Sequence, residues 1–197
     1  MIVVVAALKG GVGKTTTAVY LAAAAAAAKR DVTLVDADPQ ASAAEWLEIA
    51  DDPALEGIEV VEAPTDRLLV KALTRADPEE VVIVDSPPGQ EQMLAKAFEQ
   101  ASAAVVPTRV GGVETATAVA ALKLVPRRVP AGLVICSART YTRDYVDAVA
   151  GWREDGVENW GTIPERVGIA AGPAERLSPD GLEAYRFTWR KVSRAAR

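Results

Sequence analysis

Short apolar runs alternate with longer amphipathic or alanine-rich stretches along the chain. The apolar runs are rich in β-branched residues and almost free of polar ones, which is typical of parallel strands buried on both faces. They predict strands at 2–7, 32–37, 58–63, 81–85, 103–107, 132–138 and 160–164. The stretches between them predict helices at 14–30, 40–50, 66–76, 90–100, 113–124, 141–151 and 180–196. This alternation predicts an α/β fold, a doubly wound and mostly parallel sheet with helices on both faces.

The composition suits a single domain and narrows the possible chemistry. The chain has 197 residues, of which 50% are hydrophobic, so we expect one domain over 1–197 with a full core. It contains no histidine and one cysteine, Cys136, which excludes a Ser-His-Asp triad, a His-ligated metal and a disulfide framework. We expect Cys136 to be buried in the core. The start MIVVVAAL is too short for a signal peptide, and no run reaches the length of a membrane span, so we expect a soluble, cytoplasmic protein.

The string K-G-G-V-G-K-T-T, from Lys9 to Thr16, lies between the first predicted strand and the first predicted helix. Its glycines allow backbone N–H groups to converge on phosphate oxygens, and the helix that follows adds the partial positive charge of its N-terminus. We expect Lys14 to bridge the β- and γ-phosphates of a nucleotide, Thr15 to supply a hydroxyl to Mg²⁺, and Thr16 to contact the α-phosphate. The general pattern G-x-x-x-x-G-K-[ST] is not satisfied, because Leu8 occupies the position of its first glycine. Lys9 is therefore a second cation that the ordinary phosphate loop does not require.

The string VDADPQ ends the second predicted strand. Pro39 interrupts the strand, which predicts a loop at Asp38 on the carboxyl edge of the sheet, where ligands bind in doubly wound folds. A carboxylate there can orient a water on the γ-phosphate and can reach the water shell of Mg²⁺. We therefore predict Asp38 as a catalytic residue and Asp36 as a metal ligand. The structural alternative is that Asp38 caps the helix that starts at Gln40.

Asp85 follows an apolar strand in the string VVIVDSPPG, in the manner of a Walker B strand. Its carboxylate is expected to hold Mg²⁺ through water. The predicted metal ligands are therefore Thr15, Asp36 and Asp85. The stiff turn that follows ends in Gly89, which is able to move near a γ-phosphate.

Three strings, KGGVGKTTT, VDADPQAS and VVIVDSPPG, resemble those of the deviant-Walker-A ATPases of the ParA/MinD family, which are P-loop NTPases of the SIMIBI class. The continuation DPQAS is closer to the ParA (Soj-like) partition proteins. Family-like spacing extends through 105–118 and 161–170, so the resemblance covers nearly the whole chain. It implies a slow ATPase that binds ATP and Mg²⁺, and it implies that Pro164 and Arg166 lie in a loop beside the nucleotide. The family often has an asparagine near the adenine, where this chain has Cys136-Ser137-Ala138-Arg139.

Lys9 resembles the signature lysine of this family, which reaches across a nucleotide-sandwich homodimer onto the phosphates of the other subunit. Two facing ATP molecules repel each other unless cations lie between them, and Lys9 would supply such a cation. The resemblance therefore implies dimerisation in the ATP state and a weaker dimer after hydrolysis. The predicted catalytic residues are Lys9, Lys14 and Asp38. The predicted nucleotide-binding residues are Lys9, Gly10, Gly11, Val12, Gly13, Lys14, Thr15, Thr16, Pro164 and Arg166.

The resemblance also implies nonspecific DNA binding in the ATP state, although the net charge of −5 gives no global positive field. The last residues, RFTWRKVSRAAR, are basic and contain no acid, and an apolar stripe at helical spacing would dock them with the cations facing outward. The predicted DNA contacts are Arg186, Arg190, Lys191 and Arg194. Further candidates are Arg197, Arg127, Arg128, Arg139 and Arg143. The structural alternative is that the terminal basic residues complement the dipole of their helix.

The favoured function is a partition ATPase that positions plasmid, chromosome or other cargo, with a ParB-like adaptor as partner and hydrolysis resetting the switch. Such a protein would associate with the nucleoid when it is ATP-bound. Three alternatives are open. They are a MinD-like positioning ATPase whose terminal helix binds anionic lipid without stable membrane insertion, an ATP-dependent metabolic ligase of the same fold, such as a dethiobiotin-synthetase-like ligase, and an ATP-gated scaffold with little turnover.

Overall fold

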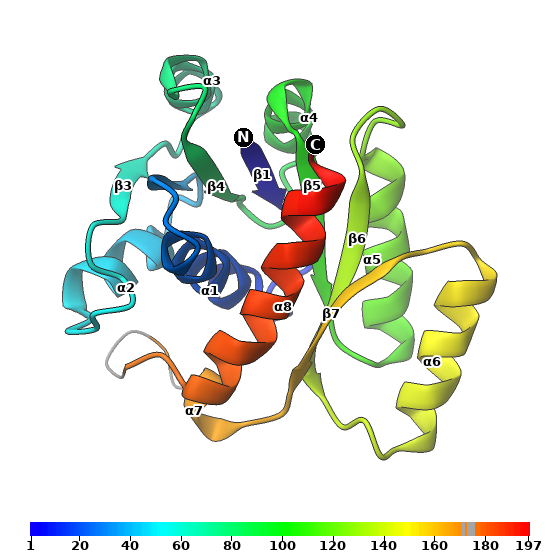
Figure 1. Ribbon diagram of the computed structural model, residues 1–197. Helices are drawn as coiled ribbons and strands as arrows, with labels where there is room; N and C mark the ends of the chain where they lie inside the picture. Colours follow the sequence, from blue (N-terminus) through cyan, green and yellow to red (C-terminus); the bar gives the residue numbers. More distant parts are fainter. Residues whose placement is uncertain (171, 173–175) are drawn as a thin grey trace.

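The sheet of the computed structural model, which describes residues 1–170, 172 and 176–197, contains seven strands that pair in parallel. Its order is β3-β2-β4-β1-β5-β6-β7, so β1 lies between β4 and β5 at the centre (Figure 1). The strands are β1 (Ile2–Val5), β2 (Val32–Asp36), β3 (Glu59–Glu62), β4 (Val81–Asp85), β5 (Ala103–Thr108), β6 (Ala131–Ala138) and β7 (Asn159–Pro164). The predicted doubly wound parallel sheet is confirmed.

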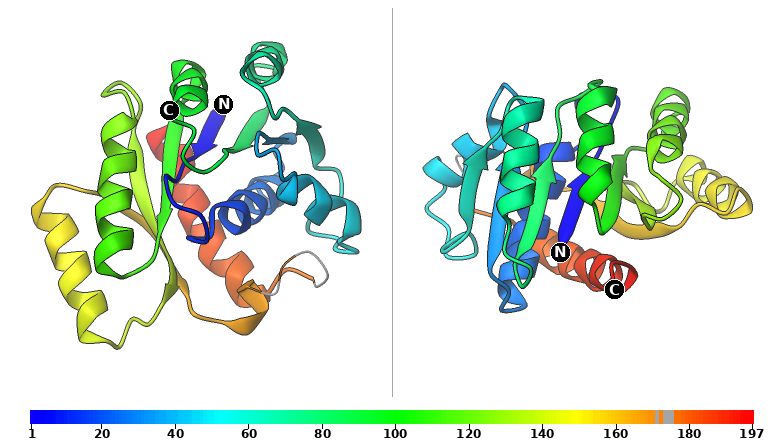
Figure 2. Two further views of the ribbon diagram at one scale, coloured as in Figure 1. Left: turned by 180° about the vertical axis from the view of Figure 1, so that it is seen from behind. Right: turned by 90° about the horizontal axis from the view of Figure 1, so that it is seen from above.

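Helices cover both faces of this sheet (Figure 2). They are α1 (Lys14–Ala27), α2 (Ser42–Ile49), α3 (Asp66–Arg75), α4 (Glu91–Gln100), α5 (Gly112–Leu124), α6 (Arg143–Glu154), α7 (Val167–Ala170) and α8 (Pro179–Ala195). Helices α1 and α8 pack side by side on one face, and α3 packs beside α4 on the opposite face. Within the described part of the chain, no helix combines the length and the apolar character that crossing a bilayer requires.

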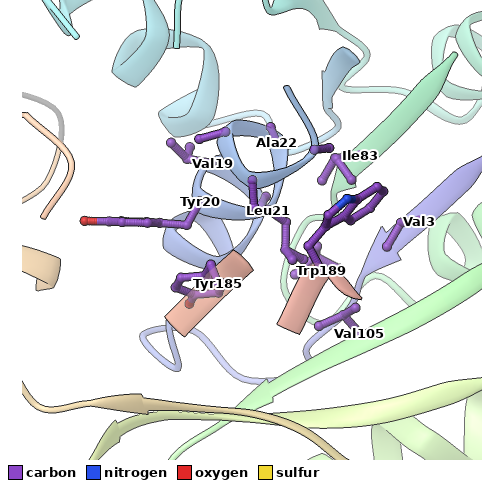
Figure 3. Close-up of a cluster of buried hydrophobic side chains, with 14 of the residues drawn as sticks. Val3, Val19, Tyr20, Leu21, Ala22, Ile83, Val105, Tyr185 and Trp189 are labelled. Carbon is purple, nitrogen blue, oxygen red and sulfur yellow. The ribbon is translucent and has the colours of Figure 1, made fainter. Parts of the chain in front are cut away.

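The alanine-rich helix α1 lies at the centre of the sheet face that it shares with α8. Its alanines at 22–25 are all buried, and their small side chains let the helix lie close to the sheet and to α8. The ring of Tyr20 stacks on Tyr185 of α8 with the ring centroids 5.1 Å apart, and Trp189 of α8 packs in the same cluster as Val3 of the sheet (Figure 3). The apolar stripe predicted for the C-terminal helix is therefore buried inside the protein.

Two details differ from what the hydrophobic pattern predicts. Every residue of β3 is exposed, because β3 is an edge strand that pairs only with β2 among the described strands. Its Val60 and Val61 are 36% and 37% exposed, so this strand is not buried on both faces. The pattern also does not predict α7, since its four residues are too few to show a helical period.

Candidate nucleotide-binding site

The loop between β1 and α1 lies at the carboxyl edge of the sheet, where ligands bind in doubly wound folds. Gly11 and Gly13 have φ angles of +77° and +95°, in the left-handed region that favours glycine. Gly13 is the N-cap of α1, and no described side chain caps this helix. Its first N–H groups therefore keep the capacity to bind an anion, and the loop has the geometry that a phosphate requires.

Lys14 and Thr15, the first residues of α1, both meet Asp85 at the end of β4. The Lys14 ammonium donates to Asp85 Oδ1 over 3.2 Å, and the Thr15 hydroxyl donates to Asp85 Oδ2 over 2.7 Å. The side chains of Lys14 and Asp85 are only 8% and 0% exposed. Burial raises the pKa of Asp85, while the Lys14 ammonium and the Thr15 hydroxyl act in the opposite direction. The three side chains form a desolvated polar cluster at the start of α1.

This cluster offers oxygen donors of the kind that Mg²⁺ prefers. Mg²⁺ is usually held by one or two protein oxygens, with waters and phosphate oxygens completing its coordination. In the described residues, no group of three or more acidic or cysteine side chains is placed to hold a metal. The hydroxyl of Thr15 and the carboxylate of Asp85 fit an ion that is shared with a nucleotide.

Asp36 occupies a structural position at the end of β2. It is 1% exposed, its Oδ2 accepts the N–H groups of Ala43 and Ala44, and its Oδ1 accepts the N–H of Asp38. Asp36 therefore caps the first turn of α2, the role that the residue pattern suggests for Asp38. Because backbone N–H groups occupy both carboxylate oxygens, this geometry does not favour Asp36 as a metal ligand.

Asp38 faces the phosphate-loop lysine. Its Oδ2 lies 3.7 Å from the Lys14 ammonium, and its side chain is 15% exposed. Its Oδ1 accepts the N–H of Gln40 over 3.0 Å, which orients the carboxylate within the loop. A mostly buried carboxylate beside Lys14 is placed where it can hold a water against a bound phosphate.

Lys9 lies in a different environment from Lys14. Its side chain is 41% exposed, and its ammonium donates to Glu114 Oε1 over 2.5 Å. Glu114 belongs to the first turn of α5, and the hydrogen bond from Lys9 lowers the pKa of this carboxyl. The two lysines of the loop thus have separate carboxylate partners, one at the surface and one in the interior.

The predicted base-side residues Pro164 and Arg166 lie beside the phosphate loop, where they line a cavity of about 40 Å³ together with Gly13. Ligand pockets usually measure about 300–1,000 Å³, so a purine could enter only if the wall of this cavity opened. Arg166 of this wall forms an exposed ion pair with Asp180 at 3.2 Å, and Glu165 beside it forms one with Arg139 at 2.6 Å.

The same cavity is lined by Ser137, from the segment that stands where the family often has an asparagine, and by Arg109 and Tyr185, which the motifs do not reveal as site residues. Arg109 directly follows β5, and its place at a strand end is the signal that could have indicated it. Cys136 is buried as predicted, and burial raises the pKa of its thiol. A Cβ on Gly13 would lie 3.2 Å from Cys136 Sγ, so the glycine leaves room for this close approach in addition to adopting its left-handed φ.

The exposed side of α8 carries the predicted DNA contacts. None of them forms an ion pair with a described acidic side chain. Two of the further candidates, Arg139 and Arg143, are instead paired with Glu165 and Asp147. The exposed cations of α8 are Arg186, Arg190, Lys191 and Arg194.

A glycine loop that opens a helix, an acidic residue at the end of β4 and a parallel sheet between two helical layers together define a P-loop nucleotide-binding protein. Residues 3–179 match the CobQ/CobB/MinD/ParA nucleotide binding domain, and the chain belongs to this family. The resemblance to ParA/MinD proteins is thereby confirmed.

The chain is similar to named members of the family. It is 30% identical over 167 residues to Protein ParA of Rhizobium radiobacter, across 80% of this chain and 74% of that protein. It is 42% identical over 108 residues to Maintenance of carboxysome distribution protein A of Gloeobacter kilaueensis, across 53% of this chain and 48% of that protein. The septum site-determining protein MinD of Pyrococcus horikoshii, complexed with Mg-ADP, has the same fold, with a TM-score of 0.78 and 18% identity over 97% of this chain and 95% of that one.

Proposed function

We propose that the protein is a positioning ATPase that dimerises around two ATP molecules, holds nonspecific DNA in that state and is reset by hydrolysis. The observation that carries this proposal is the unlike environment of the two loop lysines. Lys14 is buried against Asp85, where it serves the nucleotide of its own subunit. Lys9 is 41% exposed at the same edge of the sheet, where a second subunit can reach it.

Within one subunit, the loop binds the phosphates of ATP. N–H groups at the start of α1 bind phosphate oxygens, and the Lys14 ammonium exchanges its carboxylate partners for the β- and γ-phosphates. Thr15 and Asp85 hold Mg²⁺, which neutralises charge on those phosphates when it is bound. Asp38 accepts a hydrogen bond from a water and holds it in line with the γ-phosphorus.

Between subunits, the proposed role of Lys9 couples dimerisation to the state of the nucleotide. Two triphosphates that face each other across an interface repel, and a Lys9 ammonium from each subunit offsets this repulsion. Loss of the γ-phosphate after hydrolysis removes phosphate oxygens that this ammonium binds, so the dimer separates. ATP turnover then returns the protein to its monomeric state.

The exposed cations of α8 support DNA as the ligand of the ATP-bound dimer. Phosphate backbone attracts such a surface without base recognition, and the affinity falls as salt rises. The MinD-like alternative requires a free apolar helix face, but Tyr185, Trp189 and Val192 of α8 are at most 5% exposed. This burial favours DNA over anionic lipid.

In the proposed function, a partner protein selects the cargo, and the fold of the ATPase does not determine it. One relative is named for carboxysome distribution and another is a ParA protein, so plasmid, chromosome or another large body all fit the proposal. We expect a ParB-like adaptor to stimulate slow intrinsic hydrolysis and nucleoid association in the ATP state. The ligase alternative predicts ATP turnover that depends on a small acid or amine. The scaffold alternative predicts almost no ATP turnover.

The test first measures the molar mass of the protein by light scattering in Mg-ATP and in Mg-ADP. It then measures the retention of the protein on random-sequence DNA in each nucleotide as the salt concentration rises. The expected result is a dimer and salt-sensitive retention in ATP, with a monomer and little retention in ADP. Equal mass in both nucleotides would overturn the dimer switch. Equal DNA retention in both nucleotides would overturn the DNA part alone.

A further inference from the structure

Glu114 is fixed where it reaches the exposed lysine of the phosphate loop. The Thr108 hydroxyl at the end of β5 donates to the Glu114 carbonyl over 3.3 Å, and the Thr117 hydroxyl donates to the same carbonyl over 2.9 Å. Because β1 and β5 are neighbouring parallel strands, the loop with Lys9 and the start of α5 leave adjacent strand ends. The 2.5 Å Lys9–Glu114 pair therefore joins two anchored segments.

Gly111 leaves room for this carboxylate. Its φ of 165° is extended backbone that any residue adopts, yet a Cβ there would lie 2.6 Å from Glu114 Oε2. A side chain at this position would push the end of Glu114 aside without straining the backbone. Alanine at 111 is therefore a way to displace the carboxylate while keeping its charge.

We propose that Glu114 is a positioning residue that holds Lys9 on its own subunit and so sets the protein concentration at which the ATP-bound dimer forms. This inference rests on the proposed function of Lys9. The Lys9 ammonium must leave Glu114 to reach the phosphates of the other subunit, and each dimer separates two such pairs. The negative charge of an approaching triphosphate repels Glu114 and attracts Lys9, so each lysine is exchanged only when the other subunit carries ATP, and both are exchanged only when both subunits do.

The first test compares Glu114→Gln and Gly111→Ala with the wild type in Mg²⁺ and a nonhydrolysable ATP analogue. An ion pair at the surface changes an equilibrium by about two- to fivefold, so release of two lysines should lower the dimer dissociation constant by about 4- to 25-fold. The matched control is Asp66→Asn, which breaks the Lys96–Asp66 pair of 2.8 Å with similar side-chain exposures of 43% and 40%. The control should leave the dissociation constant unchanged.

The second test measures the acylation rate of single lysines in the nucleotide-free monomer by mass spectrometry. A hydrogen bond to a carboxylate shields an amine from an acylating reagent. Glu114→Gln and Gly111→Ala should therefore speed the labelling of Lys9 and leave that of Lys96 unchanged, whereas Asp66→Asn should do the reverse. This rate reports whether Glu114 holds Lys9 in the monomer, and the dimer dissociation constant reports whether that contact opposes dimerisation.

The outcomes separate the two proposals. A wild type that stays monomeric with the analogue, or a Lys9→Ala variant that dimerises equally well, would overturn the proposed function and this inference with it. A wild-type dimer that depends on Lys9 but is unchanged or weakened by Glu114→Gln would overturn the positioning role alone. Unchanged labelling of Lys9 in that variant would overturn it as well.

Discussion

Replacing Gly13 by alanine introduces two separate costs at the phosphate loop. A φ of +95° is left-handed backbone, which costs an L residue about 1–2 kcal/mol. The new Cβ would lie 3.2 Å from Cys136 Sγ and 3.4 Å from its Cβ, and overpacking of this kind costs about 1–3 kcal/mol. Alanine restricts the unfolded chain, which offsets about 0.4–1 kcal/mol. We expect the free energy of unfolding to fall by about 1–5 kcal/mol, which lowers Tm by about 2–20 °C in a chain of this size.

The same loop supplies matched controls. Gly11 has a φ of +77° but no neighbour within 4 Å of a built Cβ, and Gly10 has neither a left-handed φ nor a neighbour. The alanine variants should therefore rank Gly13→Ala, then Gly11→Ala, then Gly10→Ala in their loss of stability. We expect Gly10→Ala to change the free energy by no more than about 0.5 kcal/mol.

The assay is calorimetric unfolding of the three variants without nucleotide and in EDTA, so that binding does not contribute to Tm. If Gly13→Ala had the same Tm as Gly11→Ala, the proposed cost of the close approach to Cys136 would be refuted. Equal Tm values for Gly11→Ala and Gly10→Ala would refute the assignment of backbone strain to the loop.

Three further predictions concern catalysis, DNA and the core. Asp38→Ala removes the carboxylate that we propose holds the attacking water, so ATP-bound dimers should persist; light scattering in excess ATP that shows only monomers would contradict this. Charge reversal at Arg190 and Arg194 should lower DNA retention at low salt without changing the ATP-dependent mass, whereas reversal at Arg75 on the opposite face should leave retention unchanged; equal loss in both variants would argue against α8. Tyr185→Phe removes a buried hydroxyl that makes a 2.9 Å hydrogen bond and should cost about 1–2 kcal/mol in urea denaturation; an unchanged midpoint would argue against that bond.

Most of the fold could be predicted because parallel strands buried on both faces give uninterrupted apolar runs. The runs at β1, β4 and β5 are of this kind, and the apolar stripe of α8 also lies where its period predicts. The run at β3 is different, because Glu59 and Glu62 flank its two valines, and the position of a strand in the order of the sheet decides its burial. An edge position is set by pairing partners that are distant in the chain, so the apolar pattern alone does not reveal it.

The candidate site could be predicted only where its residues are neighbours in the chain. The phosphate loop is one contiguous string, and Asp85 is marked by the strand before it. Glu114 and Arg109 reach the site through long-range packing, which a single sequence does not encode in any spacing. The choice between Asp36 and Asp38 as the cap of α2 depends on the path of a few loop residues, which include a left-handed Ala41, and no residue-type preference predicts that path.

The central claim is that Lys9 serves the nucleotide of the other subunit, whereas Lys14 serves its own. The most direct measurement records bound nonhydrolysable ATP analogue and molar mass on the same samples of Lys9→Ala and Lys14→Ala. We predict that Lys9→Ala binds the analogue as the wild type does but stays monomeric, and that Lys14→Ala loses binding altogether. A Lys9→Ala protein that forms dimers at wild-type concentration would contradict the account.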